Sequence, residues 1–230
     1  MLEMRSVRVV RGGFAVLRDI DLSLESGRTT LLVGRNGAGK TTTLRAIMGL
    51  LPIEAGELAY DGADLRRMRA HARAALGIGY APEDRRLIPE FTVEDNLLLP
   101  TLALRLSAKQ AREHLRMIYD LLPELPALRA RLGGHLSGGQ GKIVALGRAL
   151  MVGTRLVLLD EPFQGLAPAL AHSYAETLAR VRAERRDLTL LVTESGPQLL
   201  EAIVDVKLQI ERGRIDSLAP ARSDAAESAA

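Results

Sequence analysis

Eight consecutive residues, 34–41, have the types and spacing of a phosphate-binding loop. They read GRNGAGKT and fit the pattern G-x-x-x-x-G-K-[S/T] without a mismatch. The glycines let the backbone curl so that successive N–H groups point at phosphate oxygens. Lys40 adds a positive charge for the β- and γ-phosphates, and the Thr41 hydroxyl can ligate Mg²⁺. A chance match arises in roughly one shuffled chain in a few hundred, so we predict a nucleotide-phosphate site.

Two adjacent carboxylates, Asp160 and Glu161, follow an apolar run about 120 residues after the loop. Asp160 can hold Mg²⁺ through water, and Glu161 can polarise an attacking water molecule. The alternative is an exposed acidic strand end, which the position at the end of a second core strand disfavours. The turn that follows, residues 164–168, lies where a pairing surface would connect two sites.

A second anion-binding edge is predicted at residues 136–140, LSGGQ, which precede the apolar helical segment 143–151. A serine hydroxyl, two glycine N–H groups and a helix N-terminus all favour negative charge. One chain does not need two such edges for one nucleotide. Two chains that face each other head to tail would each offer this edge to the other's γ-phosphate.

Around these motifs, strand-like runs alternate with helical segments, which favours a mainly parallel sheet covered on both faces. The strand-like runs are 6–10, 29–33, 76–80, 156–160, 188–193 and 204–210. The helical segments are 41–50, 168–186 and 197–203, and the second carries Leu170, Tyr174, Leu178 and Val181 on one face. The first sixty residues differ, because runs 17–24 and 57–60 with turns at 12–13 and 61–62 predict an antiparallel layer.

Residues from about 84 to 134 are predicted to form a separate helical block. Ser107 and Gln110 form a capping-box start, after which Ala111, Leu115, Ile118 and Leu122 mark one helical face. We expect a single domain over residues 2–217 and a disordered tail over 218–230, where alanine, serine and aspartate are frequent.

Composition excludes several classes of protein. The 230 residues contain no cysteine, so disulfides and thiolate metal sites are impossible. No apolar run approaches the roughly 20 residues that span a bilayer. Formal net charge is only +3, and arginine clusters at 66–73 and 180–186 are interpreted as solvated helix faces. With 3% aromatic residues and no tryptophan, a base-stacking surface and nucleic-acid binding are not expected.

The loop, the segment 136–140 and the acidic pair together resemble the nucleotide-binding subunit of ATP-binding-cassette (ABC) transporters over almost the whole chain. The segment 136–140 is the specific part, because it is peculiar to this family. The resemblance implies an α/β fold with a P-loop NTPase (RecA-like) core, an antiparallel β-subdomain and an inserted α-helical subdomain. It also implies that ATP and Mg²⁺ bind, and that two subunits close on two ATP molecules and open after hydrolysis.

The resemblance assigns roles residue by residue. Glu161 is the catalytic residue, and Thr41 and Asp160 hold the metal. The ATP-binding residues are Gly34, Arg35, Asn36, Gly37, Ala38, Gly39, Lys40, Thr41, Thr42 and Arg11. The signature that faces the partner's ATP is Leu136, Ser137, Gly138, Gly139 and Gln140. The γ-phosphate and switch positions are Glu83 and Glu194.

Within the family, segments 79–86 (GYAPEDRR), 91–97 (FTVEDNL) and 165–168 (GLAP) resemble the branched-chain amino-acid (Liv-type) importer ATPases. This resemblance implies a second ABC ATPase subunit, identical or different, two transmembrane permease subunits, and indirectly a periplasmic or surface binding protein. The expected place is the cytoplasmic face of the cell membrane, where the protein is peripheral. The solute itself is not encoded in this chain.

Four positions depart from the family pattern. Glu194 stands where a switch histidine is usual, and Glu83 where glutamine is usual, although glutamate is common in the Liv-type subgroup. Arg11 replaces an adenine-stacking aromatic residue, and Phe163 a small polar one. An extra carboxylate about 6 Å from a γ-phosphate costs on the order of 2–3 kcal/mol. We therefore expect an asymmetric pair, in which this chain's signature completes a fast site on its partner and its own site is slower.

Two other functions stay open at this point. A non-hydrolysing regulatory ATP-binding subunit is favoured by Glu194 and Arg11 and opposed by Glu161. A soluble ABC protein that acts on ribosomes or DNA usually carries two cassettes or a long coiled-coil insertion, and this chain has neither.

Overall fold

Two sheets form the framework of the chain in the computed structural model, which describes residues 1–196 and 199–217. A six-stranded sheet has the order β10-β9-β3-β8-β7-β6, and all its neighbours are parallel except β10 and β9. Its strands are β3 (Thr29–Val33), β6 (Ile78–Ala81), β7 (Leu156–Asp160), β8 (Thr189–Glu194), β9 (Val206–Glu211) and β10 (Arg214–Ser217). The predicted parallel sheet is confirmed, with β3 and β7 at the predicted bounds.

The antiparallel layer is also confirmed. Its order is β2-β1-β4-β5, with β1 (Leu2–Arg11), β2 (Phe14–Leu24), β4 (Ala55–Tyr60) and β5 (Ala63–Asp64). The turn between β4 and β5 contains Asp61 and Gly62, with φ of 47° and 82°. This left-handed pair matches the two-residue hairpin turn that an Asp-Gly sequence favours. The first strand is longer than the predicted run 6–10 and pairs with β2 and β4 in this layer.

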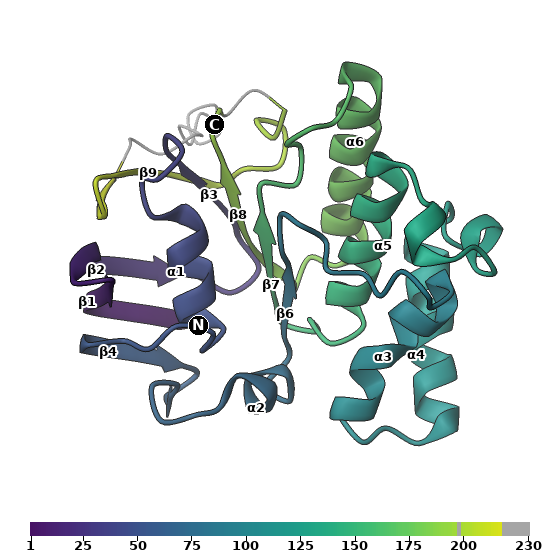
Figure 1. Cartoon of the computed structure of the whole chain (residues 1–230), viewed down its shortest axis with the longest axis horizontal. Helices are drawn as coiled ribbons and strands as arrows, with labels where there is room; N and C mark the ends of the chain where they lie inside the picture. Colours follow the sequence, from purple (N-terminus) through teal and green to yellow (C-terminus); the bar gives the residue numbers. More distant parts are fainter. Residues whose placement is uncertain (197–198, 218–230) are drawn as a thin grey trace, which may run out of the picture.

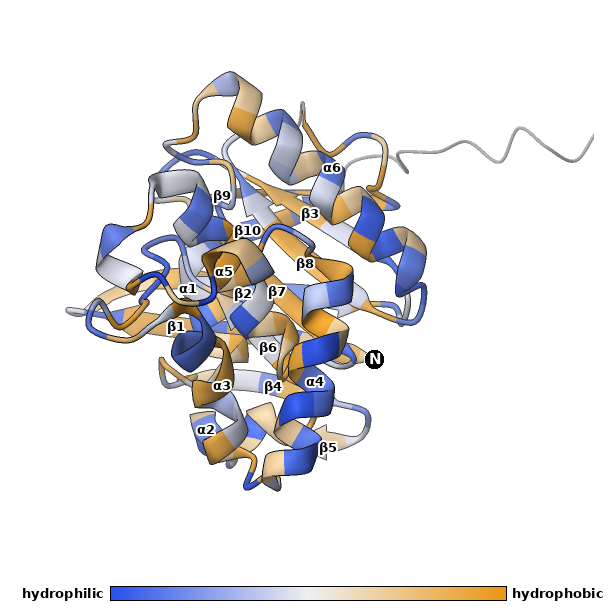
Figure 2. Ribbon diagram, turned by 90° about the vertical axis from the view of Figure 1, so that its right-hand side faces the viewer, coloured by the Kyte–Doolittle hydropathy of each residue, from blue (hydrophilic) through white to orange (hydrophobic). Residues whose placement is uncertain are grey.

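Helices cover both faces of the central sheet (Figures 1 and 2). They are α1 (Lys40–Ile47), α2 (Ala70–Ala74), α3 (Val93–Ala103), α4 (Ala108–Leu121), α5 (Gly138–Leu150) and α6 (Pro168–Glu184), with short 3₁₀ turns at Pro126–Leu128 and Gly133–His135. Alternate residues of the buried strands face opposite cores. Val157 and Leu159 pack with α3, α4, α5 and α6, whereas Leu156 and Leu158 pack with α1 and the antiparallel layer.

The helical block lies at one end of the molecule, away from the antiparallel strands (Figure 1). Helix α4 begins after Ser107, whose side chain accepts from the Gln110 amide in the predicted capping box. Its buried face carries Ala111, Leu115, Ile118 and Leu121, while its polar residues face outwards (Figure 2). Among the described residues, no helix combines the length and apolar character that crossing a bilayer requires.

Four sequence expectations are wrong or lie at least partly outside the described residues. Leu170 is exposed at 47%, and Ala171 takes its place on the buried face of α6. Residues 199–203 of the predicted helix 197–203 form turns, while 197–198 lie outside the described part, as do residues 218–230 of the predicted tail. Arg73 is 3% exposed rather than solvated. Its guanidinium donates to the carbonyls of Ala46 and Ile47 at the end of α1, where backbone acceptors lack helical partners.

Candidate nucleotide site

The loop lies between the end of β3 and the start of α1, where parallel-sheet proteins bind ligands. Gly39 directly precedes the helix with φ of 120°, a conformation that side chains other than glycine rarely adopt. A Cβ there would lie 2.9 Å from a Leu17 methyl carbon and 3.0 Å from the Ile210 Cδ1 atom. The sequence therefore needs glycine here both for the turn and for close packing against β2 and β9.

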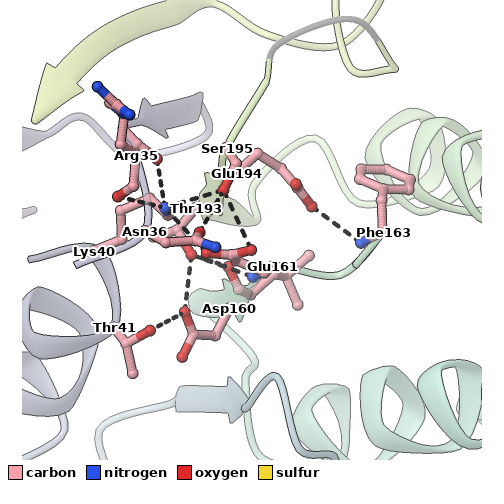
Figure 3. A network of polar contacts seen from close by, with 12 residues as sticks. Arg35, Asn36, Lys40, Thr41, Asp160, Glu161, Phe163, Thr193, Glu194 and Ser195 are labelled. Atoms are coloured by element: carbon pink, nitrogen blue, oxygen red, sulfur yellow. Dashed lines mark hydrogen bonds and ion pairs between the residues drawn. The ribbon is translucent and has the colours of Figure 1, made fainter. Parts of the chain in front are cut away.

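Lys40 is held inside the loop, with only 3% of its surface exposed. Its Nζ donates to the carbonyls of Gly34 at 2.5 Å and Arg35 at 3.2 Å, and lies 3.0 Å from Glu161 Oε1. The structure therefore brings the loop lysine and the predicted catalytic carboxylate into direct contact (Figure 3). In this state Glu161 is the anion that balances Lys40, at the place where phosphate oxygens are expected.

Asp160 is the meeting point of three hydroxyl groups. Its Oδ1 accepts from Thr41 Oγ1 and from Thr193 Oγ1, each at 3.0 Å, and its Oδ2 accepts from the Tyr80 hydroxyl at 3.1 Å. Burial, and then the Asp160 charge, raises the pKa of Tyr80, so this phenol stays a donor. The predicted pair Thr41 and Asp160 is thus adjacent, and Tyr80 and Thr193 orient it.

Sequence reasoning missed Tyr80 and Thr193, for which the sequence holds only a partial signal: each residue ends a strand-like run, 76–80 or 188–193. Each is the last residue but one of its strand, Tyr80 in β6 and Thr193 in β8. These two strands flank β7. Because the carboxyl ends of neighbouring parallel strands share one edge of the sheet, polar residues at those ends fall around Asp160.

Glu161 is fixed through its own backbone. Its φ is +43°, and its amide donates to the Thr193 carbonyl at 3.0 Å and hydroxyl at 3.2 Å. The buried ammonium of Lys142 on α5 donates to the Glu161 carbonyl at 2.7 Å. Left-handed backbone is strained for glutamate and persists only where several contacts enforce it. Lys142 is a further residue that the sequence reasoning missed, and burial lowers its pKa.

An open cavity of about 310 Å³ joins the loop to Glu161. It is lined by Val16, Asn36, Gly37, Gly39, Lys40, Thr41, Thr42, Glu83, Glu161 and Gln164. Glu83 thus lines the same cavity as the loop residues. A neighbouring hollow of about 530 Å³ is lined by Gly34, Arg35, Ala38 and Ser195 among others. Arg11 is exposed at the tip of the β1–β2 hairpin, opposite Phe14, and lines neither space.

Glu194 points away from this cavity. It is 7% exposed, and its Oε1 accepts from the Phe163 amide at 3.0 Å (Figure 3). The Phe163 ring in turn packs edge-on against Tyr174, with centroids 5.6 Å apart. The two departures Glu194 and Phe163 are therefore one structural unit, in which the carboxylate bonds the turn after Glu161.

This placement makes the stability of the fold depend on pH. Burial raises the pKa of Glu194 from 4.5 to about 7. The carboxyl is neutral in both folded and unfolded chains below pH 4.5, whereas above pH 7 the fold must bury its charge. The free energy of unfolding should therefore fall between these values, by about 3 kcal/mol.

The variant Glu194→Gln keeps an acceptor for the Phe163 amide and removes the charge. We expect it to unfold about 5–10 °C above the natural protein at pH 8, with little difference at pH 5. Thermal unfolding followed by circular dichroism at both pH values measures this, with the exposed Glu184→Gln as control. An equal shift at pH 5 and pH 8 would contradict the assignment of the raised pKa.

The segment 136–140 forms the N-terminus of α5 and does not line either space beside the loop. The Ser137 hydroxyl accepts from the Gln140 amide at 3.3 Å, and Gln140 Oε1 accepts from the Ser137 amide at 3.1 Å. Ser137 and Gly138 are exposed, Gly139 is buried, and Leu136 is partly buried against the core. The first turn of α5 is thus capped within the chain and partly exposed at its surface.

Known proteins match this chain along most of its length. The model of a family described as ABC transporter matches residues 17–164. A probable branched-chain amino acid transport ATP-binding protein of Archaeoglobus fulgidus, LivF, is 30% identical over 200 residues, which cover 87% of this chain and 84% of that protein. The lipopolysaccharide export system ATP-binding protein LptB of Escherichia coli K12 is 32% identical over 205 residues, with 88% and 83% covered.

A solved structure shares the fold. The crystal structure of MJ1267, an ATP-binding cassette of an ABC transporter in its ADP conformation, superposes with a TM-score of 0.80. The two chains are 27% identical, and the match covers 94% of this chain and 89% of that one.

Proposed function

This chain belongs to the ABC transporter family as an ATP-binding, ATP-hydrolysing subunit, and we propose that it energises the import of branched-chain or related amino acids. The observation that supports this solute class is the likeness to LivF along 84% of that protein. The segments 79–86 and 91–97 add to it, because they resemble the Liv-type subgroup. LptB, an export protein, is similarly related, so the solute class needs its own experiment.

The contacts around Lys40 suggest how ATP is received. The loop's N–H groups and Lys40 bind the phosphates, and the incoming γ-phosphate replaces Glu161 as the anion beside Nζ. Glu161, released from the ammonium but still held by its backbone, then faces the cavity and orients the attacking water. The strained turn thus holds this carboxylate close to its working position before ATP binds.

A magnesium ion fits the oxygen groups of this site. Thr41 Oγ1 and Asp160 Oδ1 are 3.0 Å apart, and Mg²⁺ prefers hydroxyl, carboxylate, water and phosphate oxygens. We propose that Thr41 and Asp160 would hold the ion. When bound, the ion neutralises charge on the β- and γ-phosphates.

A pair of chains completes the site in this proposal. The exposed Ser137 and Gly138 edge offers one hydroxyl and helix N–H groups, and its own loop makes no use of them. Two cassettes facing head to tail place each edge on the other's γ-phosphate. The partner is a second ABC ATPase, either the same chain or a different one.

A groove on the helical block is the proposed contact with the permease subunits. It has a volume of about 690 Å³ and is lined by Phe91, Asp95, Leu98, Leu99, Thr101, Leu102, Leu106, Ala108, Ala111 and Arg112. Leu102 is 74% exposed and Phe91 38%, which is unusual for large apolar side chains beside one hollow. A family member that drives transport must contact the membrane subunits, so a cytoplasmic permease helix is the expected occupant. The chain would then lie on the cytoplasmic face of the membrane.

The variant Leu102→Glu should weaken assembly with the permeases more than tenfold, because it buries a charge in an apolar contact. Its exposure in the isolated chain means that folding and ATP binding should not change. Met117→Glu, at a residue of α4 that is 57% exposed, is the matched control. Co-purification of tagged permeases with each variant measures the effect. Equal recovery with both variants would place the permease elsewhere.

The proposed function is tested by uptake of radiolabelled leucine into cells that carry the complete transporter. Loss of uptake on Lys40→Ala, with the permeases still present, supports import of this class. Uptake of other amino acids or amides alone would keep the ATPase function and correct the solute. Co-purification with ribosomes or DNA instead of permeases would favour the soluble alternative. A separate pull-down tests whether a periplasmic or surface binding protein joins the assembly.

A further inference from the structure

Ser195, directly after β8, has a hydroxyl that contacts the phosphate-binding machinery. Its Oγ accepts from Lys40 Nζ at 3.3 Å, and lies 3.1 Å from Asn36 Oδ1 and 3.5 Å from Glu161 Oε2 (Figure 3). It is exposed and lines the hollow beside the loop. These three neighbours are the loop's cation, a loop side chain and the predicted base, so a γ-phosphate beside Lys40 comes within reach of the same hydroxyl.

The side chain of the neighbouring Glu194 does not contact the phosphate-binding loop in this way. Its backbone carbonyl accepts from the Gly34 amide at 3.1 Å, and its side chain bonds the Phe163 amide. The first contact ties this residue to the start of the loop, and the second ties it to the turn that carries Glu161. Ser195 is the next residue, so both contacts also fix where its hydroxyl lies.

The chemistry of the two side chains fits these positions. Phosphate oxygens only accept hydrogen bonds, so a hydroxyl can turn and donate to them, while an ionised carboxylate repels them. The partners of Ser195 Oγ are a donor and two acceptors, and a hydroxyl can exchange either acceptor for a phosphate oxygen without leaving a buried group unpaired.

We propose that the Ser195 hydroxyl binds the terminal phosphate of ATP, and that Glu194 is a positioning residue that fixes Ser195 and Glu161 through the Phe163 amide. The switch role that the sequence analysis gives to Glu194 is thus divided in this proposal, because Ser195 contacts the phosphate and Glu194 positions its neighbours. Both roles concern how this chain binds and hydrolyses ATP, so they do not depend on which solute is imported.

Binding of ATP and ADP to the full chain tests the contact with Ser195. We expect Ser195→Ala to weaken the affinity for ATP on the order of tenfold, which is the effect of one hydrogen bond to a charged group. The affinity for ADP should change less than about twofold. Ser195→Thr retains the hydroxyl and should restore most of the difference. Ser23→Ala, an exposed serine on β2, is the control. Titration calorimetry measures each affinity, and an unchanged ratio of ATP to ADP affinity in Ser195→Ala would overturn the contact.

Steady-state hydrolysis by the assembled ATPase pair tests Glu194. We expect Glu194→Ala to lower kcat about tenfold with KM for ATP changed less than twofold, because the turn that bears Glu161 loses its tie. Glu194→Gln keeps the acceptor and should retain most of kcat. Equal loss in both variants would overturn the positioning role, and so would a selective loss of ATP affinity in Glu194→Ala. Neither assay contains the transported solute, so failure here is distinct from failure of the import proposal.

Discussion

Replacement of Glu161 by glutamine should reduce ATP hydrolysis at this chain's own site at least a hundredfold and leave ATP binding intact or tighter. Loss of a general base costs about 10²–10⁴ in rate. The substitution also removes the anion that lies 3.0 Å from Lys40, so the γ-phosphate no longer displaces a competitor. The Glu161 backbone contacts to Thr193 and Lys142 do not involve the carboxyl group, so the turn should persist.

Single-turnover hydrolysis and ATP affinity, measured on the chain with its partner, test this expectation. Glu184→Gln, an exposed carboxylate at the end of α6, serves as the control for a change of charge. Turnover that stays at the natural rate while ATP still binds would support the non-hydrolysing regulatory alternative. Lys40 provides a separate reference, since its replacement should abolish phosphate binding itself.

The same substitution in mixed pairs tests the asymmetry between the two sites. We expect the pair to lose more activity when the partner carries the change than when this chain does, because we propose that this chain's intact Ser137 edge binds the partner's nucleotide. Repulsion of the γ-phosphate by Glu194 is not the reason for the slow own site that we expect. That carboxylate bonds the Phe163 amide instead of facing the cavity, and a hydroxyl stands beside Lys40. Equal losses from either subunit would rule the asymmetry out.

The elements that the sequence predicts well are those with local causes. Strand β7 runs from Leu156 to Asp160 as predicted, because an uninterrupted apolar run ends at a charged residue. Helix α4 starts after Ser107 because the capping box satisfies backbone N–H groups within four residues of sequence. The loop motif likewise carries its geometry within eight residues.

The remaining features depend on contacts between distant segments. Thr193 and Tyr80 reach Asp160 only because β6, β7 and β8 are neighbours, and strand order is not visible in local patterns. Arg73 is buried because the end of α1 needs donors, although its neighbours in sequence are surface arginines. The direction of the Glu194 side chain is likewise set by Phe163, 31 positions away. A motif thus predicts which residue occupies a position, whereas the packing around it decides which way the side chain points.

Ser137→Arg, a change in the partly exposed segment 136–140, should abolish steady-state hydrolysis by the assembled pair. In the proposed head-to-tail pair, an arginine side chain would fill the space between the two cassettes and displace the Ser137 hydroxyl from the partner's γ-phosphate. Each chain would still bind ATP in its own loop, because Ser137 does not line the cavity there. The expected result is therefore unchanged ATP affinity with turnover reduced to background.

A simple loss of helix capping would also lower stability, and the chain contains a matched control for it. Ser107 caps α4 with the same hydroxyl contact at 3.3 Å to a glutamine amide three residues later. Both substitutions remove a capping box and should cost about 1 kcal/mol of stability. If hydrolysis in Ser107→Arg stays near the natural rate while Ser137→Arg is inactive, capping does not explain the loss. If Ser137→Arg hydrolyses ATP as Ser107→Arg does, the nucleotide is not shared across the pair and each chain works alone.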